Sequence, residues 1–494
     1  MSYLHRFAVA ACLPLLLGGC ASFSGDSGFS AVAQATRERT GLEGKMLRSD
    51  DDRRALAELL HQKLQQPLSA DDAVHIALLN NRGLQANYWS LGIAEADLVQ
   101  AGRLQNPAFG FKRTHGGGDV AIERTLAFNF VNLITLPLAA RIEAERFEQV
   151  KLTVAGAALQ VAADTRRAYY EAVAAAQGME YAQQVGDAAE AGAELGRRMQ
   201  RAGNWSKLDM AREQAYHAEA LADAARARRQ VGAAREKLTR LMGLDGADIA
   251  YRLPPHLPEL PAAPQALQDV EQAAIDQRLD IRAATLDARH TASSLGLNRA
   301  TRFINVLELA AVRESASGQP GARGYQFTLE IPLFDWGSAR VARAEAVYMQ
   351  SVNRLAETVT NARSEARDSY RDYRDAYELA RHYRDSVIPL RRQISEETLL
   401  RYNGMLLSVF ELLADSRAQS AAVNAYIDAL REFWIAQTNL ETALGGRLST
   451  NANANASINA NASVNAHTSI SVNARADAAA TDTTDTTVTN GASK

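Results

Sequence analysis

Cysteine is scarce in this sequence: two occur among 494 residues, and both lie within the first 20. A disulfide framework is therefore excluded for the rest of the chain. Long hydrophobic runs are also lacking after the N-terminus, since no uncharged apolar stretch reaches the roughly 18 residues that indicate a membrane-spanning helix. The formal net charge is only −3 at pH 7, so the composition indicates no nucleic acid or acidic polymer as a partner.

Motifs that carry catalysis are absent as well. The nine histidines are scattered, and the sequence contains no His-Glu-x-x-His, Cys-x-x-Cys or Gly-x-Ser-x-Gly arrangement and no phosphate-binding loop. Between Arg363 and Asp385 the charged residues alternate in sign, which is typical of a solvated helix face rather than of a basic patch. We therefore expect no enzyme, no cofactor and no resident metal ion.

A short apolar run, Phe7–Leu17, is present at the N-terminus. At about a dozen residues it is shorter than a membrane span and is typical of the core of a signal peptide. The run ends in Leu17-Gly18-Gly19-Cys20, which resembles a bacterial lipobox. We therefore expect residues 1–19 to be removed and Cys20 to carry lipid; the alternative is an ordinary secretory signal with a chance cysteine. Ala21, where an aspartate would favour the inner membrane, points to the outer membrane of a Gram-negative cell.

Helix-forming residues dominate the chain, with Ala, Leu, Arg, Glu and Gln filling long blocks that hold little Gly or Pro. At about 1.5 Å per residue, a helix of about 60 residues spans roughly 90 Å, which favours coiled-coil packing over an ordinary globular helix. The alternative is a set of shorter helices, with interruptions or kinks at Gly192, Gly196 and Pro389. The four blocks predicted to be helical are Arg141–Arg201, Leu208–Met242, Val341–Arg401 and Ser408–Leu444.

The chain divides into two similar halves, offset by about 200 residues. Each half is predicted to contain, in order, a helix, a strand pair, a long helix, a glycine turn and a further helix. The halves are residues 67–252 and 265–448, separated by a Pro-rich linker, 253–264, that cannot continue a helix. Residues 20–66 precede them as an N-terminal lipidated segment. Residues 449–494, rich in Asn, Ala, Ser and Thr, are expected to form a disordered tail, because they lack the apolar content of a core.

Two amphipathic hairpins are predicted, one from Phe109 to Phe130 around a glycine turn and one from about 303 to 333 around a Gly/Pro loop. Apolar and polar residues alternate along the strands, but Arg124 interrupts the apolar face. Strands of about 10 residues with contrasting faces suit a transmembrane barrel, and a soluble hairpin with one buried face is the alternative. The residues expected to face the membrane are Phe128, Phe130, Tyr325, Phe327, Leu329 and Ile331.

A membrane position for these hairpins has a consequence for assembly. Four strands cannot close a barrel wide enough to hold a channel, and an open sheet edge in lipid leaves backbone groups unpaired. Several copies of the chain must then share one barrel. Gln326, Thr328 and Glu330 would face its lumen.

The two strand-to-helix junctions carry a family resemblance. Ile331–Arg340 (IPLFDWGSAR) is similar to the junction in the TolC family of outer-membrane efflux proteins, and Phe130–Leu138 (FVNLITLPL) resembles the junction of its lipoprotein members, although it lacks the Asp-x-Gly step. The resemblance covers roughly residues 67–446. It implies a mainly α fold with a small β part. Long coiled-coil hairpins would form a trimeric α-barrel, and four strands per chain would contribute to a shared twelve-stranded transmembrane β-barrel.

The resemblance also implies the partners and the place of this protein. It implies a homotrimer in the outer membrane, in contact with its lipids and extending into the periplasm. A periplasmic adaptor (membrane fusion protein) would link it to an inner-membrane pump of the RND type.

Two turns join the predicted long helices. Gly203 and Gly404 suit the left-handed position that ends a helix. A serine followed three residues later by an acidic residue, as at Ser206 and Ser408, has capping-box spacing. In the family such turns form the tip where the adaptor docks; plain helix-hairpin chemistry is the alternative, with docking along 209–213 and 411–417 instead. The predicted docking residues are Gly203, Trp205, Ser206, Asp209, Gly404, Leu406, Leu407, Ser408 and Glu411.

The function that the resemblance implies is an exit duct for a tripartite efflux system. One alternative is the outlet of a type I protein secretion system, and another is a structural helical lipoprotein without a channel. The hairpins favour a channel, because a merely anchored coiled coil has no use for membrane strands. No His- or Met-rich motif in the sequence identifies the cargo.

Overall fold

The computed structural model describes residues 22–116, 119–303 and 306–448. The signal segment 1–19, the predicted lipidation site Cys20 and the tail 449–494 lie outside the described residues. The chain divides into two units, Met1–Arg447 and Leu448–Lys494, and every described helix and strand belongs to the first. None of the described helices is both long and apolar enough to cross a membrane.

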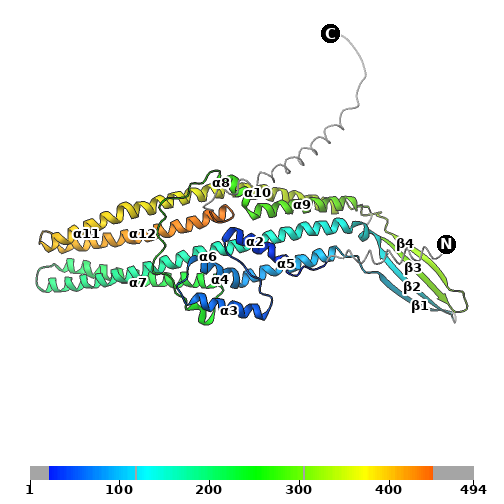
Figure 1. Ribbon diagram of the computed structural model, residues 1–494, viewed down its shortest axis with the longest axis horizontal. Helices are drawn as coiled ribbons and strands as arrows, with labels where there is room; N and C mark the ends of the chain where they lie inside the picture. The colour runs from blue at the N-terminus through cyan, green and yellow to red at the C-terminus, as the bar shows by residue number, and fades with distance from the viewer. Residues whose placement is uncertain (1–21, 117–118, 304–305, 449–494) are drawn as a thin grey trace, which may run out of the picture. The chain divides into compact units, whose positions relative to one another are not determined.

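The predicted order of elements occurs in each half, as Figure 1 shows. The first half contains α2 (Phe29–Thr40), α3 (Asp50–Leu64), α4 (Ala70–Asn80), α5 (Arg82–Ala101), β1 (Ala108–Gly116), β2 (Asp119–Asn129), α6 (Phe130–Arg201), α7 (Lys207–Met242) and the short 3-10 helix η1 (Gly246–Ile249). The second half contains α8 (Val270–Gln277), α9 (Leu279–Ala300), β3 (Leu307–Ala316), β4 (Ala322–Leu329), α10 (Ser338–His382), the π-helical turn η2 (Tyr383–Val387), α11 (Ile388–Asn403) and α12 (Val409–Ala443). An internal repeat relating the halves stays a prediction, as do the domain bounds.

The four described strands form one antiparallel sheet in sequence order. Both predicted hairpins are present, and β2 also pairs with β3 across the two halves. The strand assignment of Phe130 was wrong, because the Asn129 side chain caps a helix that begins there, accepting two backbone N–H groups at 3.0 and 3.4 Å. Ile331 was also wrongly placed in a strand: β4 ends at Leu329, and Pro332 has no N–H with which to extend the pairing.

The first long helix exceeds its predicted length. α6 is one helix of 72 residues, about 108 Å long at about 1.5 Å per residue. Gly192 and Gly196 do not interrupt the helix, since both residues lie inside α6. The predicted interruption at Pro389 is confirmed: η2 separates α10 from α11 directly before it, where proline removes a helical hydrogen bond.

The main hydrophobic core lies where α2, α4, α5 and α9 pack on α6. Leu78 of α4 and Tyr88 of α5 are fully buried there, and the Phe29 ring meets the Tyr88 ring edge-on at 4.9 Å between centroids. On α6 the facing residues are small, as at Ala155 and Ala158, which lets the helices approach closely. Each fully buried large side chain contributes about 1.5–3 kcal/mol, so this core stabilises the packing of these helices on the Val154–Ala162 part of α6.

The Pro-rich linker forms no helix, as predicted, and is fastened to the second half by its carbonyl groups. The Trp434 indole N–H donates to the Pro258 carbonyl at 3.0 Å, and the Tyr377 hydroxyl donates to the Ala262 carbonyl at 2.8 Å. The linker, residues 253–264, therefore packs against α10 and α12 and is held there by these hydrogen bonds.

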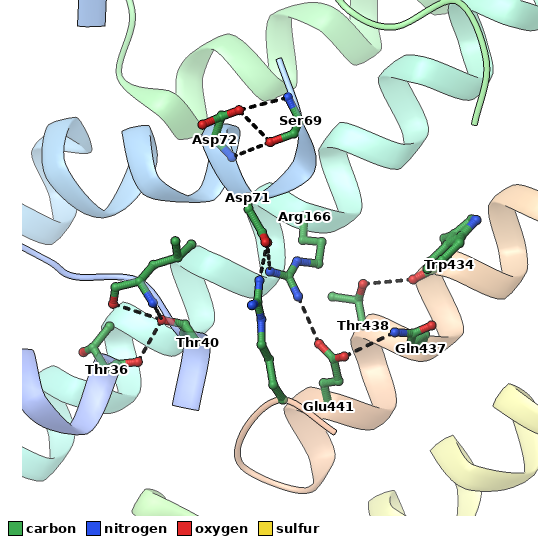
Figure 2. Close-up of polar contacts among 12 residues, drawn as sticks. Thr36, Thr40, Ser69, Asp71, Asp72, Arg166, Trp434, Gln437, Thr438 and Glu441 are labelled. Atoms are coloured by element: carbon green, nitrogen blue, oxygen red, sulfur yellow. Dashed lines mark hydrogen bonds and ion pairs between the residues drawn. The ribbon is translucent and has the colours of Figure 1, made fainter. Parts of the chain in front are cut away.

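An ion-pair network joins the two halves (Figure 2). Arg166 of α6 donates to Asp71 at 2.7 Å and to Glu441 of α12 at 3.1 Å, and the Arg447 guanidinium also pairs with Asp71. The Arg166 and Glu441 side chains are each only 13% exposed. Glu441 accepts a further hydrogen bond from Gln437 at 3.3 Å. Because Arg166 and Glu441 are largely shielded from water, each needs its partners, so their ion pair specifies how α12 lies on α6.

Candidate functional site

One face of the sheet is apolar and exposed. The register aligns Phe128, Leu309 and Phe327 in a row across β2, β3 and β4. Tyr325 and Leu329 lie two residues to either side of Phe327, on the same face. Exposure of these side chains ranges from 39% at Leu309 to 85% at Tyr325. A contiguous apolar surface of this kind is unfavourable in water and indicates contact with a partner or with lipid.

The opposite face of the sheet is polar or small. Thr328 lies across from Glu308, and the Lys112 ammonium lies 3.9 Å from the Glu123 carboxylate. Within the described residues, the outer edges of β1 and β4 have no partner strand. The described sheet therefore has one apolar face, one polar face and two edges without a partner strand.

The α6–α7 turn follows the sequence prediction. Gly203 has a φ of +75°, the left-handed conformation expected at the end of a helix. Ser206 caps α7, since its hydroxyl accepts the Asp209 backbone N–H at 3.1 Å and donates to the Asp209 carboxylate at 2.7 Å. Local chemistry alone therefore accounts for this reversal.

The α11–α12 turn departs from the prediction at its glycine. Gly404 has a φ of −79°, so the left-handed role predicted for it was wrong. Met405, with a φ of +58°, takes that conformation instead. The reason is that α11 ends at Asn403, two residues beyond the predicted Arg401: the Gly404 N–H still donates to the Leu400 carbonyl at 3.0 Å, and the chain reverses only after it. Met405 and Leu406 are then 94% and 76% exposed, and Leu407 is half-buried.

The capping box of the second turn is complete. The Ser408 backbone N–H donates to the Glu411 carboxylate at 2.9 Å, and the Glu411 N–H donates to the Ser408 hydroxyl at 3.4 Å. Hydrogen bonds from the Ser408 backbone and hydroxyl lower the pKa of Glu411 below its usual value. The carboxylate therefore stays charged at neutral pH, at the start of α12.

The two turns contact each other through two stacked aromatic rings. Trp205 stacks on Phe410 of α12 with ring centroids 4.4 Å apart. Trp205 is only 8% exposed, so in this structure it holds the turns together rather than forming part of the exposed end surface. Gly196 makes room for it, because a Cβ at that position would lie 2.9 Å from the indole ring.

An ion pair joins the same two hairpins further along. Arg417 of α12 donates to Glu213 of α7 at 2.8 Å, and its guanidinium lies 3.9 Å from the centroid of the Tyr216 ring. Glu213 is only 3% exposed. The surface considered as an alternative docking site, 209–213 and 411–417, is therefore partly occupied by contacts within the chain.

The sequence did not predict the left-handed conformation of Met405, the stacking of Phe410 on Trp205 or the pairing of Glu213 with Arg417. Gly196 was the available signal, since a glycine inside a long helix can mark the close approach of a neighbouring side chain as well as an interruption or a kink. In the described part of the chain, no group of three or more His, Cys, Asp or Glu side chains could hold a metal ion.

Replacing Gly196 by alanine is expected to destabilise the protein by about 1–3 kcal/mol, because the Trp205 ring must shift to admit the methyl group. Gly178 is the matched control in the same helix: a Cβ there meets nothing within 4 Å, so alanine should stabilise by up to about 1 kcal/mol. Urea unfolding of the two variants measures both changes. Shifts of the same sign would contradict the close packing of Trp205 on α6.

Several solved structures share this architecture. The outer-membrane channel OprN has a TM-score of 0.65 at 18% identity, covering 86% of this chain and 96% of that one. The CmeC channel of Campylobacter jejuni has a TM-score of 0.64 at 17% identity, covering 79% and 88%. The open-state MtrE channel of Neisseria gonorrhoeae has a TM-score of 0.64 at 18% identity, covering 76% and 89%. This chain has the fold of these outer-membrane channels.

These findings confirm the resemblance to the TolC family at the level of the fold, including a mainly helical chain with a few strands. No family model matches the sequence, and no curated protein does. The likeness is therefore one of three-dimensional structure, and sequence identities of 17–18% show the fold alone.

Proposed function

We propose that this chain is the outer-membrane exit duct of a tripartite efflux system. Three copies form one channel, with β1–β4 of each in the outer membrane and the long helices in the periplasm. The protein itself is not an enzyme: an inner-membrane pump, of the RND type, supplies the energy, and a periplasmic adaptor joins the pump to the duct.

The observation that carries the proposal is the sheet. Its exposed face is apolar around Phe128, Phe327 and Tyr325, which suits contact with acyl chains. Its edges at β1 and β4 are open, and unpaired backbone groups in lipid cost several kcal/mol each. Edge-to-edge pairing of three copies closes twelve strands and removes every edge. The polar face, with Thr328 and Glu308, then lines the lumen.

The ends of the helical hairpins are the proposed contact with the adaptor. α6 begins at the end of β2 and runs 72 residues to the first turn, so the turns lie a full helix length from the sheet (Figure 1). The exposed apolar side chains there, Met405 and Leu406, have no partner surface in the described chain. Of the predicted docking residues, we retain Gly203, Ser206, Asp209, Gly404, Leu406, Leu407, Ser408 and Glu411 and leave out Trp205.

The test is the assembly and conductance of the purified protein. In detergent, the full chain should run as a trimer of about 150 kDa and open ion-conducting pores in planar bilayers. A stable monomer that makes no pores would contradict the proposal and favour a structural lipoprotein. Deleting the gene and measuring loss of small-molecule efflux against loss of a secreted protein then separates a pump outlet from a type I secretion outlet.

Cys20 is expected to be the lipidated N-terminus of the mature protein. Intact-mass analysis of the membrane-extracted chain should show loss of about 19 residues and the added mass of acyl groups. In Cys20→Ala the acyl mass should be absent, while the protein still reaches the membrane through its strands. A wild-type chain that begins at Met1, or is cut after Cys20, would rule lipidation out.

A further inference from the structure

Three arginines form a row across the apolar face of the sheet. The register pairs Arg124 of β2 with Arg313 of β3, and Arg313 with Arg323 of β4, so the three side chains leave the sheet on the same side. All three are exposed. Neighbouring strands are about 4.8 Å apart, so the row spans roughly 10 Å. Arg124, which broke the apolar pattern of the sequence, is thus one member of a cluster assembled from three strands.

The row lacks a counter-charge. Within the described part of the chain, none of the three guanidinium groups makes an ion pair or a hydrogen bond with an acidic side chain, and no Asp or Glu lies on this face of the sheet. The neighbouring acids along the strands, Glu123 and Glu314, lie on the opposite face. Like charges placed directly across from each other destabilise a sheet. An anion bound from outside the chain would relieve this repulsion.

The position of the row indicates which anion it suits. On the side toward the helices, the same face continues with Tyr325, Phe327 and Leu329, and on the other side lie the hairpin ends. A shallow groove beside the row is lined by the arginines together with Phe109 and Leu126. An anion held here is therefore next to an apolar surface, which suits a molecule with both a charged head and acyl chains.

We propose that Arg124, Arg313 and Arg323 bind the phosphate groups of a phosphorylated lipid in the outer leaflet. The guanidinium fork pairs with phosphate oxygens in two parallel hydrogen bonds, which lysine cannot reproduce. The acyl chains of that lipid lie along the groove and along the apolar side chains of β4, Tyr325, Phe327 and Leu329. This inference rests on the proposed membrane position of the sheet.

The test uses the full chain in detergent and native mass spectrometry. Wild type is titrated with lipid A, a bisphosphorylated acylated glucosamine disaccharide, and with its dephosphorylated form. The variant R124Q/R313Q/R323Q should bind lipid A about tenfold more weakly, and the dephosphorylated lipid should bind wild type equally weakly. Lys112→Gln, which removes a cation from the opposite face of the same sheet, is the matched control and should leave binding unchanged. Arg313→Lys should bind with intermediate affinity.

Three results would overturn the inference: equal binding of lipid A by wild type and the triple variant, equal binding of the phosphorylated and dephosphorylated lipids, or full displacement by inorganic phosphate alone. If the triple variant fails to assemble, Arg313→Gln at the centre of the row carries the same comparison. Pore formation by the same wild-type sample keeps the two proposals apart. If wild type forms pores and the variants bind lipid A as well as wild type does, only the proposed lipid site is contradicted. If wild type forms no pores, the proposed channel is contradicted.

Discussion

Replacing Leu329 by arginine is expected to weaken insertion of the assembled protein by up to about 2–4 kcal/mol per chain. Leu329 lies opposite Leu307 on the apolar face and is 48% exposed. It is the last residue of β4, six residues from Arg323, at the end of the apolar face that adjoins the helices; the full loss of about 2–4 kcal/mol applies to a position at the bilayer midplane. A guanidinium there must leave water for acyl chains. The measurement is urea unfolding of the protein refolded into lipid vesicles, together with the yield of trimer.

Thr328→Arg is the matched control for this change. The neighbouring residue lies on the polar face, directly across from Glu308, so the new guanidinium would meet water and a carboxylate. Its effect on stability should be small, within about 1 kcal/mol. Equal losses at the two positions would show that the faces are not divided between lipid and lumen.

Replacing Gly404 by glutamate is expected to abolish export while leaving the trimer intact. Gly404 has an ordinary helical φ, and a Cβ there meets its nearest neighbours at 3.5 Å, so the backbone accepts a side chain. The carboxylate would stand beside the exposed Met405 and Leu406, in the proposed contact with the adaptor. An unpaired charge buried in an interface costs more than the roughly 1.4 kcal/mol that lowers an equilibrium constant tenfold.

The measurement is crosslinking of the adaptor to a photoreactive group at Leu406, with export assayed in the same cells. Crosslinking should fall about tenfold or more in Gly404→Glu. Gly404→Ala is the control, because it adds the same Cβ without a charge and should preserve both signals. Export that survives the glutamate, with undiminished crosslinking, would place docking elsewhere on the hairpins.

Much of the fold was predictable because its signals are local. The helix caps at Ser206 and Ser408, the break before Pro389 and the alternation along β4 each depend on residues within a few positions of one another. Where the prediction failed, the backbone conformation was decided by a helix cap or by a neighbouring residue that the sequence pattern did not single out. Asn129 turned the expected end of a strand into the start of α6, and Gly404 keeps a negative φ because Met405 takes the left-handed conformation.

The sequence by itself determined the classes of element, their order and the two turns, since periodicity, proline and capping residues act over short distances. Only the tertiary structure decided what those elements bring together. Trp205 is buried between two turns about 200 residues apart and stacks on Phe410, and Gly196 leaves the space that its ring occupies. Arg124 became part of a charged row, because strand register aligns it with residues nearly 200 positions away. Such juxtapositions depend on pairing and packing between distant segments, which no local pattern encodes.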